Sequence, residues 1–146
     1  MDVQRRAIAA SLLALVLTFG PASARAADPV VELRFSELYV DDFSIAFSDK
    51  LKSLAGKRVE VRGFMAPPLK ADGNFIVLTR SPVEVCPFCA AVTDWPIDIL
   101  AVYLLEDAVH VSAKVAVVGT LDIGAKTDAQ LGFVSLIRLE NATLLR

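Results

Sequence analysis

The feature that most constrains the fold of this chain is a two-residue alternation of apolar and polar side chains. Residues 58–65 place Val59, Val61 and Met65 on one side of the alternation and mostly charged residues on the other, and residues 109–118 repeat the pattern. Successive side chains of a β-strand point to opposite faces, so this period predicts strands with one buried face. We expect the buried side chains to include Val59, Val61, Val111, Val115 and Val117.

Short β-rich runs separated by turn residues continue through most of the chain. We expect strands at residues 58–65, 74–80, 97–105, 109–118 and 132–139, with a short final strand after residue 142. Residues 97–105 are almost wholly apolar, as in a strand that is covered on both faces, and residues 38–54 fit either a short helix or a strand pair. This pattern predicts a mainly β fold, a small OB-like β-barrel of five or six strands with one short helix.

Residues 1–26 have the organisation of a secretory signal peptide. A basic head with two arginines precedes the uncharged, apolar residues 7–19, and an A-x-A cleavage site ends at Ala26. The apolar run is shorter than the roughly 20 residues that cross a bilayer, so we expect cleavage after Ala26 rather than a membrane anchor. The mature chain, residues 27–146, is then a single periplasmic domain without an integral membrane segment.

The charge of the mature chain argues against a nucleic-acid partner. Without residues 1–26 the chain keeps 12 of its 15 Lys and Arg and 16 of its 17 Asp and Glu, so its formal net charge falls from −2 to −4. Proteins that bind nucleic acids concentrate Lys and Arg on one face to contact phosphates. We therefore expect no nucleic acid among the partners.

The sequence contains one motif with distinct chemistry, Cys86-Pro87-Phe88-Cys89, on a connection between two expected strands. Two thiolates at this spacing can face one soft metal ion, Cu(I) or Zn(II). In an oxidising compartment the same pair can form a local disulfide, which closes a very short loop and adds little rigidity. Catalytic thiol–disulfide exchange is a third interpretation, although the single later proline, Pro96, lies too near to supply the distant cis-proline loop of glutaredoxins.

A metal site at these cysteines needs further donors, because two thiolates are half of a tetrahedral zinc site. His110, the one histidine of the sequence, and Met65 are the donors that we expect first, and Asp94 and Asp98 are further candidates. His110 is also compatible with a solvated strand position, and Met65 with simple core filling. A hydrolase is disfavoured because the sequence has no G-x-S-x-G elbow.

Two segments resemble a known family. Residues 54–67 read L-A-G-K-R-V-E-V-R-G-F-M-A-P, and residues 115–121 read V-A-V-V-G-T-L. The first segment is similar to the L-x-G-K-x-V-x-V-x-G-F-M-x-P motif of an uncharacterised family of exported bacterial proteins with an OB-like barrel and a cysteine loop. The resemblance covers about residues 50–146 and implies a periplasmic barrel, without an established activity.

These observations predict an exported periplasmic binding or accessory protein rather than an enzyme. In the leading interpretation Cys86 and Cys89 handle copper or zinc for a periplasmic protein partner or transporter. The alternatives are a structural or protein-interaction module in which the two cysteines form a disulfide, and a thiol–disulfide oxidoreductase.

Overall fold

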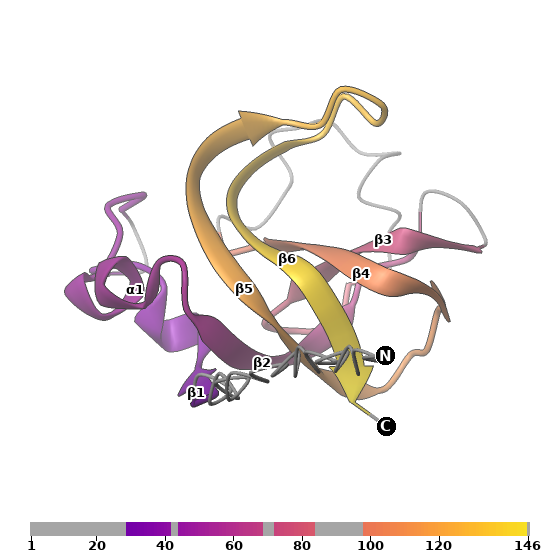
Figure 1. The fold of residues 1–146 in the computed structure, drawn as a ribbon, viewed down its shortest axis with the longest axis horizontal. Helices are drawn as coiled ribbons and strands as arrows, with labels where there is room; N and C mark the ends of the chain where they lie inside the picture. The colour runs from indigo at the N-terminus through magenta and orange to yellow at the C-terminus, as the bar shows by residue number, and fades with distance from the viewer. Residues whose placement is uncertain (1–28, 42–43, 69–71, 84–97, 146) are drawn as a thin grey trace, which may run out of the picture.

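The computed structural model describes residues 29–41, 44–68, 72–83 and 98–145, and Figure 1 shows their arrangement. The expected signal peptide and the cysteine motif lie outside these residues. The elements in chain order are β1 (Val31–Leu33), a 3₁₀ turn (Phe35–Glu37), α1 (Asp49–Leu54), β2 (Arg58–Met65), β3 (Asp72–Thr79), β4 (Leu100–Val109), β5 (Lys114–Thr127) and β6 (Val134–Leu145).

Strands β2 to β6 form a closed five-stranded barrel, which confirms the predicted OB-like fold. The strand order is β2-β3-β4-β6-β5, and β5 returns to pair with β2, from Arg58↔Thr120 to Phe64↔Lys114. The pair β4–β6 is parallel, whereas every other pair around the barrel is antiparallel. The extra strand β1 pairs in parallel with Val59–Val61 of β2. This part of β2 does not pair with β3, whose partners in β2 are Phe64 and Met65.

The alternation in the sequence accounts for the barrel interior. Val59, Val61 and Met65 of β2 are buried, and Val117 of β5 meets them in the same core. The apolar start of β4 is covered on both faces, as expected: Val102 belongs to the interior, while Ala101 packs outside the barrel in a second cluster with Phe133. Burial on both faces explains why this strand shows no alternation.

The prediction of one strand over residues 109–118 is wrong. Val109 is the last residue of β4, and β5 begins only at Lys114 after a short connection. Val111 lies on that connection and is 40% exposed rather than buried, while Val115 packs partly buried against the core. Alternation of side chains persists through the connection, so the period alone does not locate the end of a strand.

The last two strands are longer than predicted. β5 continues to Thr127, beyond the expected strand end at residue 118, and β6 absorbs the separate final strand that we expected after residue 142. The two strands pair along most of their length, with register shifts after Val118 and after Ile123. These irregularities bend both strands around the barrel (Figure 1).

The helix α1 resolves the open choice for residues 38–54. Ser48 caps it by accepting a hydrogen bond from the Leu51 backbone N–H at 3.0 Å, and Leu51 and Leu54 are buried against the barrel. Gly56, with a φ of 76°, then turns the chain into β2. Within the described residues, no helix has the length and apolar character needed to span a membrane.

Candidate functional site

Met65 and His110, the two metal donors expected first outside the cysteine motif, line the same small cavity. The cavity lies between β3 and the residues that follow β2, and its volume is about 20 Å³. That space suits one water molecule or one ion and no organic ligand. Met65 is 4% exposed and belongs to the barrel core, whereas His110 is half-buried, so the imidazole is the more accessible donor.

Cys86 and Cys89 lie outside the described residues, as does Asp94. An ion pair joins the described residues on the two sides of this segment: Arg80 Nε, after β3, lies 3.3 Å from Asp98 Oδ2, before β4. Asp98 is therefore engaged in an ion pair and is a weaker candidate for a metal ligand. Over the ranges that the structure describes, no three His, Cys, Asp or Glu side chains gather as a metal cluster.

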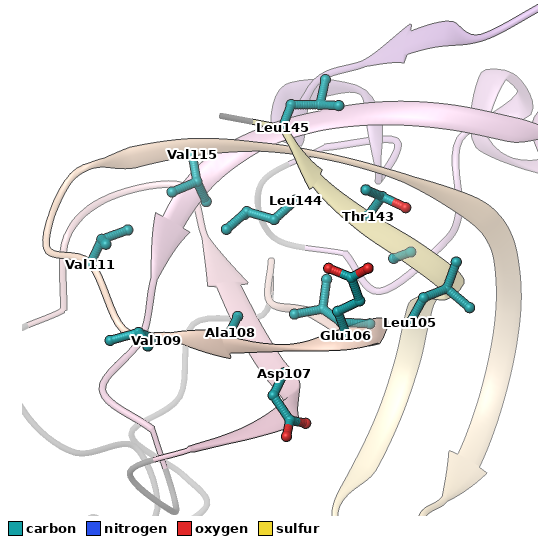
Figure 2. A pocket seen from close by; sticks show the side chains of 12 residues that line it. Leu105, Glu106, Asp107, Ala108, Val109, Val111, Val115, Thr143, Leu144 and Leu145 are labelled. Atoms are coloured by element: carbon teal, nitrogen blue, oxygen red, sulfur yellow. The ribbon is translucent and has the colours of Figure 1, made fainter.

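A larger hollow, which the sequence analysis missed, opens between β4 and β6 (Figure 2). Its volume is about 590 Å³, within the range of about 300–1,000 Å³ that is common for ligand sites. It is lined by the second half of β4, the connection that follows it, the start of β5 and the end of β6, namely Leu104, Leu105, Glu106, Asp107, Ala108, Val109, Val111, Val115, Ala142, Thr143, Leu144 and Leu145.

The hollow exists because β4 leaves its regular pairing. Gly73 pairs with Ala108 and Phe75 with Tyr103, so the single residue Asn74 of β3 lies opposite the four residues 104–107 of β4. Extra residues in one strand bend it away from its neighbours. On its other edge, β4 pairs with β6 only as far as Leu104↔Ala142. The two strands therefore separate, and the gap between them is the hollow.

The walls of the hollow are apolar and one carboxylate points into it. Leu105 is 65% exposed, Val109 71% and Leu145 44%, and these large apolar side chains gather around one opening. Figure 2 shows the Glu106 carboxylate pointing from β4 toward Thr143, whereas that of Asp107 points away. No ion pair to Glu106 occurs among the residues that the structure describes.

A polar cluster on another part of the barrel has a structural role. Arg138 is 4% exposed, and its Nη2 lies 2.7 Å from Asp122 Oδ2, while its Nη1 donates to the Gly124 carbonyl at 2.8 Å. Nearby, burial first and then the Asp128 carboxylate raise the pKa of Tyr103 to about 12. Backbone N–H donors, chiefly that of Leu131, lower the pKa of Asp128. These contacts fix the β5–β6 connection.

Comparisons with known proteins add little to this geometry. No protein-family model matches the chain, and no curated protein sequence matches it. The crystal structure of a DUF3299 family protein from Pseudomonas aeruginosa PAO1 is similar to this chain with a TM-score of 0.49 and 14% sequence identity. The alignment covers 81% of this chain and 97% of that chain.

Proposed function

We propose that the protein is an exported periplasmic binding protein that holds one soft metal ion, Zn(II) or Cu(I), between Cys86 and Cys89 with His110 as a further donor. The observation that carries the proposal is the pair of cysteines at metal-ligand spacing, both in one connection. Thiolate and imidazole are the donors that these ions prefer. Delivery of the ion to a periplasmic partner or transporter is the role that we assign to such a site.

The length of the connection is compatible with this set of donors. Cys86 lies seven positions after Thr79, the end of β3, and an extended chain of that length spans up to about 24 Å. His110 lies near the other end of β3, beside Gly73, and the six positions from Gly73 to Thr79 rise about 20 Å. A cysteine in this connection is thus within reach of the imidazole.

Burial distinguishes the two additional donors. The Met65 side chain fills the barrel core, and a thioether that binds a metal there would have to leave its apolar neighbours. His110 lies on the connection after β4 and is half-buried, so its ring can turn toward a ligand without disturbing the core. This contrast favours His110 over Met65.

Metal analysis combined with thiol titration of protein purified from the periplasm tests the proposal. We expect one Zn or Cu per chain in the wild type and none in the double variant Cys86→Ser with Cys89→Ser. His110→Ala should weaken binding by at least about tenfold, since even the loss of an outer-shell partner costs about 10- to 100-fold. Met65→Leu, which conserves volume in the core, is the matched control and should keep its metal.

The same measurements separate the alternative functions. Unchanged metal content in the double cysteine variant would refute the proposal. A wild type that has neither metal nor free thiols would instead show the local disulfide of a structural module. Thermal unfolding of the double variant should match that of the wild type, because a loop this short contributes little to stability.

A further inference from the structure

We propose that the hollow between β4 and β6 binds an extended peptide segment of a partner protein, with apolar side chains at alternate positions and a Lys or Arg that faces Glu106. The proposal rests on other residues than the metal site, because neither Met65 nor His110, the described donors expected first, lines this hollow. An open strand edge, apolar walls and one carboxylate meet at this hollow.

The end of β6 has an open backbone edge. Thr143, Leu144 and Leu145 pair with β5 on one side, but the pairing with β4 on the other side stops at Ala142. In the described part of the chain, three consecutive residues thus present one unpaired edge to the hollow. This edge is about 10 Å long at the rise of a strand, and an added strand would pair with it.

The backbone groups of this edge limit the kind of occupant. Water satisfies them while the hollow is open, but an apolar ligand that covered them would leave buried N–H and C=O groups without partners. An extended peptide supplies both donors and acceptors at the spacing of the edge. Its alternate side chains would then contact the apolar walls that Leu105, Val109 and Leu145 contribute.

Charge specifies one further feature of the occupant. An occupant that covers the Glu106 carboxylate removes it from water, which is costly unless a cation replaces the lost hydration. No described residue that lines the hollow is a Lys or Arg, and we assign this cation to the partner. The Asp107 carboxylate points away from the hollow (Figure 2), so an occupant does not need a cation to pair with it.

An array of eight-residue peptides tests the proposal with the mature exported protein. Val, Ile, Leu or Phe occupies every second position of these peptides, and Lys or Thr the positions between. By fluorescence anisotropy, we expect peptides with a central Lys to bind, and the same peptides with a central Glu not to bind. N-methylation of alternate backbone nitrogens should abolish binding, because it removes the donors that pair with β6.

The neighbouring acids of β4 provide a matched pair of variants. Glu106→Gln should weaken the binding of the Lys peptides about fivefold, which is the effect expected for the loss of a partly shielded ion pair. Asp107→Asn should change their affinity less than about twofold. Equal effects of the two variants, binding that survives N-methylation, or no peptide binding tighter than about 1 mM would overturn the proposal. So would concentration-dependent dimerisation that Glu106→Gln abolishes, since a second copy would then fill the hollow.

Discussion

Replacing Gly119 with alanine tests whether close contact between β5 and β6 closes the barrel. Gly119 pairs with Val59 of β2, and on its other side it lies opposite the register shift of β6. A Cβ atom at this position would lie 2.9 Å from the Cβ atoms of both Ala142 and Leu139 and 3.1 Å from the Glu140 carbonyl oxygen. These atoms are fixed by the backbone, so no side-chain rotation relieves the contact.

The distances set the size of the effect. Carbon atoms normally pack about 3.5–4.0 Å apart, so two strands would have to separate by roughly 0.6 Å or more. Such overpacking costs about 1–3 kcal/mol, and the lower chain entropy of unfolded alanine recovers about 0.4–1 kcal/mol. We therefore expect Gly119→Ala to lower the free energy of unfolding by about 1–2 kcal/mol, and Tm by roughly 4–8 °C.

Urea unfolding followed by circular dichroism measures the change, and Gly73→Ala is the matched control. Gly73 lies in β3 with no atom within 4 Å of an added Cβ and with no positive φ, so its replacement should leave stability unchanged or slightly higher. A Gly119→Ala variant as stable as Gly73→Ala would refute the reasoning. Ala142→Gly in the Gly119→Ala background should restore part of the loss, because it removes one of the three close contacts.

Three further predictions concern charge and processing. Asp122→Asn should destabilise the protein by about 1–3 kcal/mol in urea unfolding, because the buried Arg138 guanidinium loses the nearer of its two carboxylate partners and keeps only Glu140, at 3.7 Å; a change below about 0.3 kcal/mol would contradict this role. The raised pKa of Tyr103 stabilises the fold fully below pH 10, and that contribution is lost as the pH rises from 10 toward 12. Phenolate absorbance should show this late titration disappearing in Tyr103→Phe and moving toward pH 10 in Asp128→Asn. N-terminal sequencing of the exported protein should begin at Ala27, and an uncleaved product held in the membrane would refute the signal peptide.

Local periodicity was sufficient to predict the barrel and much of its core. The pattern of apolar residues reports how many faces of a strand are buried: one face at the alternating residues around Val59 and Val61, and both faces at the uniformly apolar start of β4. This property is local to each strand. A chain of this length with such strands and one short helix has few ways to bury them all, and a small closed barrel is one of them. The glycines of the motifs can be recognised in the sequence, but the need for glycine at these positions is tertiary. An added Cβ on Gly63, for example, would lie 2.8 Å from the Phe35 ring.

The tertiary structure alone decided where strands end, which residues meet and where the surface opens. Val111 keeps the alternation of a strand yet lies exposed, because the end of β4 depends on its pairing partners and not on its own side chains. Met65 and His110 line one cavity, although they are 45 positions apart, because the residues that follow β2 run along β3 toward the end of β4. The hollow beside Glu106 likewise follows from four residues of β4 lying opposite Asn74. Register between distant strands is a non-local property, so no short window of sequence contains it.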